Sequence, residues 1–366
     1  MIARLVPAAV FKTVVPVLNR ELGSIPRRSR HLEIPVITGI SVFDSVYLLY
    51  FDSINNFKTK KNVIFIFILN KLKYMMSKNI TLNEVGLREG FQNLRRVYST
   101  KLKLTVLDGL LKAGMRHIQL GSFVHPKVLP QMADAELLFS SAPKLDNVVY
   151  SGFILNEQGL TRAIDCGVRK VETSMSLHES YGFKNTGMKS DRSYEEMNRL
   201  VRLAHQHDIS IRVGLQCAWG VANEAALGPD TVLSYIDKLM ALDPDKICLA
   251  DTAGLATPEM IKEYLDIIIP QIGGKPLVLH FHETRQGGQA NIQAALEMGV
   301  REFDSSIGGL GGSPFIVNTT GNIATEDIVK IMDEAGISTG IDRLGLTETA
   351  SQLKKTLQSN ALKSVI

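Results

Sequence analysis

His280 and His282 are the two residues whose type and spacing point most directly to chemistry. They flank Phe281 in the apolar stretch 277–282, which is predicted to form a strand, and residues two apart in a strand face the same side. Two imidazoles are therefore expected side by side, with Phe281 on the other face. Histidine commonly binds divalent transition metals, and two histidines with a carboxylate leave positions open for substrate oxygens. The plainer interpretation is a pair of core or supporting histidines.

Glu89 is the candidate carboxylate, and Arg88 precedes it directly. Neighbouring residues of an extended strand face opposite ways, so a turn is needed to bring both inward. Arg88 would then bind a carbonyl oxygen or stabilise a developing enolate. The alternative for Arg88 is a salt-bridged arginine on the rim of the fold.

Two further features carry weaker signals. Asp251 would orient a histidine or act on a substrate hydroxyl, or else only cap the loop after its strand. The glycine-rich loop Gly308–Pro314 would serve as a mobile lid or as a phosphate-binding loop.

Short β-branched runs alternate with helical stretches from residue 79 onward, which predicts a parallel α/β fold. The predicted strands are 80–85, 117–121, 148–154, 170–175, 210–215, 246–250, 277–282 and 302–305. Eight strand–helix units in about 290 residues indicate a (β/α)8 TIM barrel. An open doubly wound sheet is the alternative, but no strand is followed by a G-x-G-x-x-G turn. In a closed barrel the first strand lies beside the eighth, which brings Glu89 near His280.

Helix boundaries also leave signals in the sequence. Ser193 with Glu196 forms a capping-box pattern, and Thr257 followed by Pro258 reads as an N-cap with a first-turn proline. Thr325 is predicted to open a further helix that Gly336 closes.

The composition excludes several classes of protein. The chain has 366 residues, 45% of them hydrophobic and 21% charged, which is ordinary for a globular protein. Three cysteines cannot form a disulfide framework, so we expect a reducing compartment. The net charge of +4 is unevenly spread: residues 1–75 hold 11 Lys and Arg against 4 Asp and Glu, and the rest holds 30 against 33. One Trp and no basic stripe in the core make a nucleic-acid partner a poor fit.

We therefore expect residues 1–75 to be an N-terminal extension and residues 76–366 to be the catalytic barrel. Met75 and Met76 mark an alternative start. The basic residues of the extension favour an organelle transit peptide as a second interpretation, and a membrane or partner anchor is the third. Its apolar runs 34–50 and 63–69 are interrupted or too short to span a bilayer, and we expect no membrane segment in the core. We expect a cytoplasmic protein, or a mitochondrial one if this segment is a transit peptide.

Several motifs together resemble one enzyme family. The stretch Asn83–Asn93 (NEVGLREGFQN) is similar to the first-strand signature of the metal-dependent aldolase-lyase and Claisen-condensation barrels. Within that superfamily the chain most resembles the hydroxymethylglutaryl-CoA lyase family. The supporting motifs, in the family's order, are 122–132, 250–254, 280–284, 304–314 and 321–327.

The resemblance implies roles for individual residues. Glu89, His280, His282 and Asn322 match metal-binding or metal-proximal positions for Mg²⁺ or Mn²⁺. Arg88 matches an arginine that steadies the enolate of the leaving acetyl-CoA, and Asp251 matches an acid near the substrate hydroxyl. The implied reaction is retro-aldol cleavage of a 3-hydroxyacyl-CoA, and we expect a homodimer.

Three positions depart from the family pattern. Glu89 stands where the lyases have Asp, Gln119 where they have Glu, and Ser313 where they have a cysteine that serves in proton transfer. Gln cannot take a proton and a serine hydroxyl is a poor acid, so two proton-handling positions are altered. Two alternatives stay open: an enzyme that condenses an acyl-CoA with a 2-oxo acid, and a metal-binding homologue with weakened catalysis.

Overall fold

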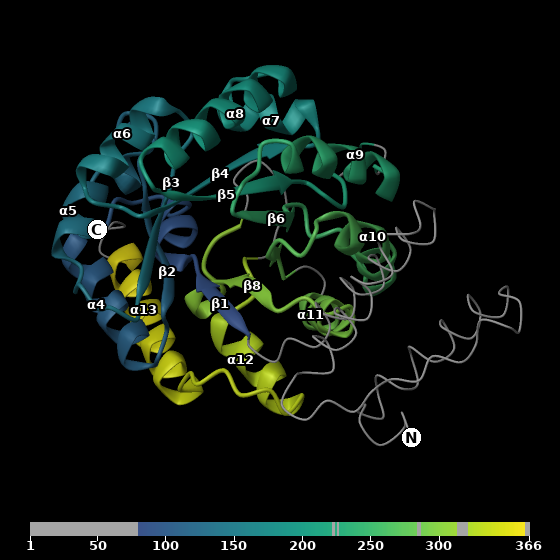
Figure 1. The fold of residues 1–366 in the computed structure, drawn as a ribbon. Helices are drawn as coiled ribbons and strands as arrows, with labels where there is room; N and C mark the ends of the chain where they lie inside the picture. The colour runs from purple at the N-terminus through teal and green to yellow at the C-terminus, as the bar shows by residue number, and fades with distance from the viewer. Residues whose placement is uncertain (1–79, 222–223, 225–226, 284–286, 313–320, 363–366) are drawn as a thin grey trace, which may run out of the picture. The chain divides into compact units, whose positions relative to one another are not determined.

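The computed structural model describes residues 80–221, 224, 227–283, 287–312 and 321–362. Eight parallel strands close into a barrel in chain order, and helices surround it (Figure 1). The strands are β1 (Thr81–Glu84), β2 (His117–Ser122), β3 (Val149–Phe153), β4 (Lys170–Ser176), β5 (Ser210–Gln216), β6 (Lys246–Asp251), β7 (Leu277–Phe281) and β8 (Glu302–Ser305). The predicted (β/α)8 barrel is confirmed, and every predicted strand is present within two residues of its expected ends. The expected extension, residues 1–75, lies outside the described residues.

Each strand is followed by helical structure that covers the outside of the barrel. The helices are α4 (Thr100–Lys112), α5 (Ala135–Ser141), α6 (Glu157–Asp165), α7 (Glu179–Thr186), α8 (Ser190–Gln206), α9 (Pro229–Met240), α10 (Pro258–Gln271), α11 (Gly288–Glu297), α12 (Thr325–Glu334) and α13 (Arg343–Leu362). Among the described residues, no helix is long and apolar enough to cross a membrane.

The helix signals are mostly confirmed. Thr257 caps α10, because its side chain accepts a hydrogen bond from the backbone N–H of Met260 at 3.3 Å. Thr325 opens α12, and Gly336 follows its end with a φ of 70°. The prediction that Ser193 caps a helix is wrong: α8 begins at Ser190, so Ser193 lies inside its first turn. The capping-box pattern recurs by chance inside a helix whose actual N-cap residue, Lys189, makes no side-chain capping bond.

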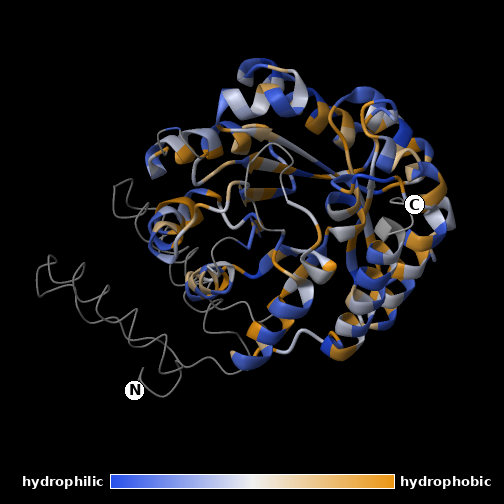
Figure 2. Cartoon of the chain, turned by 180° about the vertical axis from the view of Figure 1, so that it is seen from behind, coloured by the Kyte–Doolittle hydropathy of each residue, from blue (hydrophilic) through white to orange (hydrophobic). Residues whose placement is uncertain are grey.

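The apolar core lies between the strands and the helices. Along α10 the buried residues Ile261, Tyr264, Leu265 and Ile268 repeat at helical spacing and face the sheet. The outer helices therefore mix hydrophobic and hydrophilic residues along their length (Figure 2). Burial of these stripes fixes the helices and, through them, the positions of the strand ends.

The closure between β1 and β8 positions the candidate site. Thr81 pairs with Glu302 and Glu84 with Ser305, while β7 pairs with β8 on the other side. The loop that follows β1 consequently lies close to the carboxyl ends of β7 and β8. In a TIM barrel, these strand ends are where active sites form.

Candidate active site

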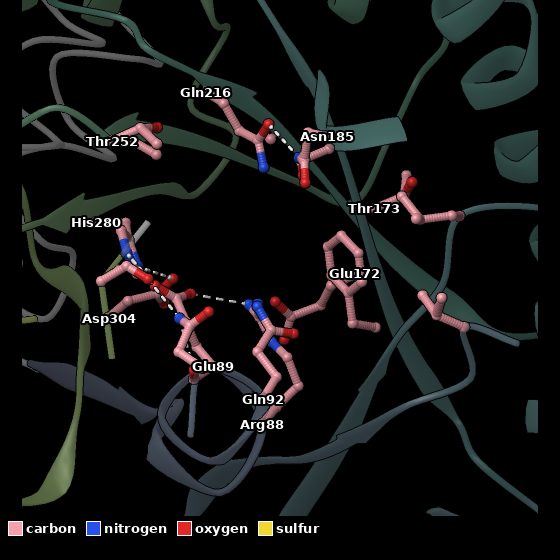
Figure 3. Close-up of a pocket in the computed structure, with 18 of the residues that line it drawn as sticks. Arg88, Glu89, Gln92, Glu172, Thr173, Asn185, Gln216, Thr252, His280 and Asp304 are labelled. Carbon is pink, nitrogen blue, oxygen red and sulfur yellow. Dashed lines mark hydrogen bonds and ion pairs between the residues drawn. The ribbon is translucent and has the colours of Figure 1, made fainter. Parts of the chain in front are cut away.

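Glu89, His280 and His282 form one cluster at the carboxyl end of the barrel. Figure 3 shows Glu89 and His280 side by side. Nε2 of His280 lies 3.3 Å from Oε1 of Glu89, and Nε2 of His282 lies 3.4 Å from the same oxygen. The two Nε2 atoms are 3.2 Å apart. The sequence prediction that two histidines and this carboxylate converge is thus matched by the geometry, although the roles of these residues stay predictions.

Local backbone structure explains how the three side chains meet. A single π-helical turn, Gly86–Gly90, follows β1 and brings Arg88 and Glu89 to line the same cavity. The two side chains form an ion pair of 3.2 Å. On β7, Phe281 points away from the histidines and packs on Trp219, with ring centroids 5.6 Å apart.

Asp304 on β8 supports His280 from behind. Oδ2 of Asp304 lies 3.2 Å from Nδ1 of His280, and Nη1 of Arg212 donates to Oδ1 of Asp304 at 2.6 Å. A carboxylate on the far nitrogen of an imidazole fixes its orientation and raises its basicity as a metal ligand. Sequence reasoning assigned no role to Asp304 or Arg212. A charged residue at an inward strand position was the available signal.

The charges of the cluster are strongly coupled. Burial alone would lower the pKa of His280, but the carboxylates of Glu89 and Asp304 raise that pKa to about 10. Burial opposes ionisation of Glu89, yet the charges of His280 and Arg88 hold its pKa well below its ordinary value. Glu89 and Asp304 are therefore two buried anionic groups that stabilise a positive charge beside them.

An unpaired amide oxygen near the cluster fits a metal ion. Oδ1 of Asn322 is buried and has no hydrogen-bond partner among the described residues. Asn322 is brought beside His282 by a bridge between their backbones, and its Nδ2 donates to the carbonyl oxygen of Leu310 at 3.0 Å. The two Nε2 atoms that face each other cannot both carry a proton at 3.2 Å without repulsion. A divalent cation would satisfy the carboxylate, both imidazoles and the amide oxygen together.

Arg88 is held in place from three sides. Its Nε donates a hydrogen bond to Oε1 of Gln119, its guanidinium carbon lies 4.8 Å from the ring centroid of Phe153, and it pairs with Glu89. Arg88 lines the cavity, whereas Gln119 lies behind it and is buried, with its Nε2 unpartnered. Gln119 therefore contacts the arginine and is not among the described cavity-lining residues.

Asp251 does not belong to the Glu89–His280–His282 cluster. The carboxylate of Asp251 accepts hydrogen bonds from the backbone N–H groups of Leu255 at 2.8 Å and Ala256 at 3.1 Å. These hydrogen bonds are those expected if Asp251 caps the loop after its strand. Burial of the carboxyl group raises the pKa of Asp251. Asp251 is not among the described residues that line the cavity. Ser313 lies outside the described residues.

The cluster opens into a cavity of about 510 Å³. Its wall on the side of β4, β5 and α7 carries polar residues to which the sequence assigned no role: Glu172, Thr173, Asn185 and Gln216 (Figure 3). Glu172 pairs with Arg212 and accepts a hydrogen bond from Ser151 at 2.5 Å. Asn185 and Gln216 bond to each other at 3.1 Å. Period-two alternation places every second residue of a strand on the inward face, but it does not predict their partners or the position of Asn185, which lies on α7.

A TIM barrel with a Glu–His–His cluster at its carboxyl end and an arginine beside it is the architecture of a metal-dependent enzyme. Comparison with known proteins narrows this class. The family model described as HMGL-like matches residues 79–353. The chain belongs to the HMGL-like family, whose members depend on a divalent metal, and it is a carbon–carbon lyase of that type.

Individual relatives agree with this assignment. The chain is 33% identical over 274 residues to the hydroxymethylglutaryl-CoA lyase of Pseudomonas mevalonii, covering 75% of this chain and 91% of the relative. It is 31% identical over 290 residues to the mitochondrial hydroxymethylglutaryl-CoA lyase of Macaca fascicularis, covering 79% and 89%. Among solved structures it is similar to an HMG-CoA lyase from Acinetobacter baumannii in complex with coenzyme A and 3-methylmalate. That match has a TM-score of 0.73 and 31% identity, and covers 77% of this chain and 92% of the other.

Proposed function

We propose that this lyase cleaves a 3-hydroxyacyl-CoA, such as 3-hydroxy-3-methylglutaryl-CoA, into acetyl-CoA and a keto acid. The observation that carries the proposal is the Glu89–His280–His282 cluster with Arg88 beside it in one cavity. The lyase relatives named for this substrate, and the relative solved with coenzyme A, support it.

Glu89, His280, His282 and Asn322 would hold the metal, Mg²⁺ or Mn²⁺. The bound ion would supply a Lewis acid for the hydroxyl and carboxylate oxygens of the substrate. Two imidazoles beside two oxygen ligands favour Mn²⁺, since Mg²⁺ prefers oxygen donors.

Arg88 would bind the thioester carbonyl oxygen. In the retro-aldol step the substrate hydroxyl loses its proton, and the bond between carbons 2 and 3 breaks as a carbonyl forms at carbon 3. The electron pair passes to the thioester as an enolate, and a proton then returns to carbon 2 to give acetyl-CoA. A guanidinium fixed in advance by Gln119, Phe153 and Glu89 stabilises the developing charge without reorganising.

The residues that move protons complete the proposal. The family resemblance makes Asp251 the proposed acceptor of the hydroxyl proton, although its carboxylate also caps the loop after β6 and is not among the described residues that line the cavity. Ser313 is the proposed relay in the glycine-rich loop. Gln119 cannot take a proton, so its proposed role is to hold Arg88.

A thioester assay tests the function. Purified protein with Mg²⁺ or Mn²⁺ and 3-hydroxy-3-methylglutaryl-CoA is expected to release acetyl-CoA, detected by mass spectrometry, and H280A is expected to abolish it. His205, which pairs with Asp245 on the exposed surface, provides the matched histidine control, so H205A is expected to retain activity. Free CoA formed only when acetyl-CoA and a 2-oxo acid are supplied together would instead indicate condensation. Metal binding with no thioester turnover in either assay would indicate the binding homologue.

We also propose a homodimer, and a barrel unit of residues 76–366 preceded by the 1–75 extension. Light scattering on the purified protein tests whether it is a homodimer. The barrel unit is tested by expressing residues 76–366 alone, which should retain turnover. For location we propose the cytoplasm, or the mitochondrion if residues 1–75 act as a transit peptide, which a fluorescent fusion of that segment would decide.

A further inference from the structure

The side of the cavity formed by β4, β5 and α7 holds a pair of carboxamides. Gln216 is the last residue of β5, and Asn185 lies on α7. Nδ2 of Asn185 donates a hydrogen bond to Oε1 of Gln216 at 3.1 Å, and both residues line the cavity. Across the cavity lie Glu89, His280 and Arg88 (Figure 3). The amide pair is therefore part of the same site but is distinct from the metal cluster.

The bond between the two amides leaves one donor and one acceptor for a ligand. The bond uses Oε1 of Gln216, and among the described residues the Nε2 donor of Gln216 and the Oδ1 acceptor of Asn185 have no other partner. Figure 3 shows both atoms directed into the cavity. Rotating both amide groups by 180° exchanges their roles and again leaves one donor and one acceptor. The chemical character of the pair does not depend on which way the amides are turned.

A neutral group that both donates and accepts hydrogen bonds complements such a pair. A hydroxyl or a primary amide meets both requirements. A carboxylate offers only acceptors, and an alkyl group offers neither, so it would leave both amide atoms desolvated and unpaired.

The proposed reaction indicates which part of the substrate reaches this side of the cavity. Carbon 3 of the substrate has four substituents. Its hydroxyl and its carboxylate-bearing arm would lie at Glu89 and His280, and its thioester arm would lie at Arg88. The fourth substituent, a branch that is methyl in 3-hydroxy-3-methylglutaryl-CoA, is the one left to face the opposite side.

We propose that Gln216 and Asn185 determine specificity by hydrogen-bonding a hydroxyl or carboxamide on the carbon 3 branch of the acyl-CoA. The preferred substrate is then a 3-hydroxyglutaryl-type thioester with a polar neutral branch in place of the methyl group. This inference rests on the proposed lyase function, since that function orients carbon 3.

The test compares two thioesters that differ only in this branch: 3-hydroxy-3-methylglutaryl-CoA and its 3-hydroxymethyl counterpart. The wild type is expected to cleave the hydroxymethyl thioester with a kcat/KM at least about tenfold higher, because two hydrogen bonds are gained. Q216M and N185L are each expected to reduce that preference several-fold, mainly through KM. Q131M is the matched control. Gln131 also lines the cavity, but its amide bonds the carbonyl oxygen of Leu94 at 2.9 Å, so the preference should be unchanged.

A binding measurement separates this inference from the proposed function. Calorimetric titration of each thioester into the Mn²⁺-loaded protein gives the same preference as a ratio of Kd values, even if no turnover occurs. Cleavage of both thioesters with equal kcat/KM, or a preference that survives both Q216M and N185L, would overturn the role of the pair. An amide of the pantetheine arm of CoA could also donate and accept the hydrogen bonds that the Gln216–Asn185 pair offers. Weaker binding of free CoA to Q216M than to wild type would assign the pair to the CoA arm and overturn the proposal.

Discussion

Nδ1 of His280 lies 3.2 Å from Oδ2 of Asp304, and this contact joins a candidate metal ligand on β7 to a buried carboxylate on β8. The arrangement leaves Nε2 of His280 facing Glu89 at 3.3 Å. Asp304 is in turn fixed by Arg212, which also pairs with Glu172 on β4. One face of the candidate metal site is thus held by a chain of charges that spans the barrel interior.

Removing the charge of Asp304 is expected to weaken metal binding. D304N would leave the imidazole of His280 less well oriented and less basic, so Mn²⁺ affinity should fall roughly 10- to 100-fold. The Mn²⁺ affinity is measured by a titration in which electron paramagnetic resonance detects the free ion. D245N is the matched control, because Asp245 pairs with His205 at 3.3 Å on the surface. An unchanged affinity in folded D304N would contradict the supporting role.

Replacing Glu89 tests the carboxylate ligand itself. E89A should reduce Mn²⁺ affinity by more than the roughly 10- to 100-fold expected for an outer partner, because a charged ligand is lost. E89D retains the charge on a side chain one methylene shorter and should bind Mn²⁺ measurably. Calorimetric titration of Mn²⁺ into wild type, E89D and E89A checks whether the affinity falls in that order. Equal affinities for E89A and E89D would mean that another group holds the ion.

Gly311 provides a steric test of Asn322. Gly311 has a φ of 121°, and a side chain there would collide with the amide of Asn322 and lie 3.6 Å from Cγ of Glu89. G311A should therefore lower both metal affinity and lyase turnover. Gly308 in the same loop also has a positive φ, 62°, but among the described residues a side chain there would meet only Ala350, at 3.6 Å. G308A should lose some stability and retain metal affinity, and similar losses of metal affinity in both variants would argue against a role for Asn322.

Glu84 makes the stability pH-dependent. Burial raises its pKa from 4.5 to about 7, against hydrogen bonds from Thr325, Ile307 and Gly86 that lower it. Between these pH values the folded state binds more protons than the unfolded state, so this contribution to the free energy of unfolding falls as the pH rises. Between pH 4.5 and about pH 7, the contribution of Glu84 to the free energy of unfolding falls by about 3 kcal/mol.

The variant E84Q isolates this effect, because the amide mimics the protonated acid and does not titrate. Urea unfolding at pH 5 and pH 8 should show a larger loss of stability for wild type than for E84Q over that range. The same pH slope in both proteins would assign the dependence to other groups.

The double variant Q119E/S313C tests the two proton-handling departures. A carboxylate in place of the Gln119 amide would form an ion pair with Arg88, and a thiol in place of the Ser313 hydroxyl is a far better acid. If the cavity binds 3-hydroxy-3-methylglutaryl-CoA, the double variant should turn it over faster than wild type. No gain in kcat, with binding of that thioester confirmed by calorimetry, would mean that the cavity serves another substrate.

The barrel was predictable from the sequence because alternation of strands and helices is a local, repeated pattern. The His280–Phe281–His282 spacing was equally informative, since a strand fixes the relative directions of alternate side chains. The turn after β1 was less accessible. Its single π-helical turn brings both Arg88 and Glu89 to the cavity, and no propensity pattern indicates such a turn.

The supporting residues could not be predicted for a different reason. Asp304, Arg212 and Glu172 come from three strands, and their contacts depend on the registers by which those strands pair. Asn185 lies on a helix, and its contact with Gln216 depends on how α7 sits on β4 and β5. Partners across a closed sheet are properties of the assembled barrel, which alternation along one strand does not contain.

The pairing of β1 with β8 has a consequence for how the protein folds. Glu89 and Asn322 lie near opposite ends of the barrel sequence, and they share a site only after β8 has paired with β1. A growing chain therefore cannot assemble the four proposed ligands until almost the whole barrel has been synthesised. An ion that binds only the closed form shifts the equilibrium toward closure by mass action. Metal binding would then indicate that β1 and β8 have paired. Removal of the metal by a chelator would favour separation of these two strands.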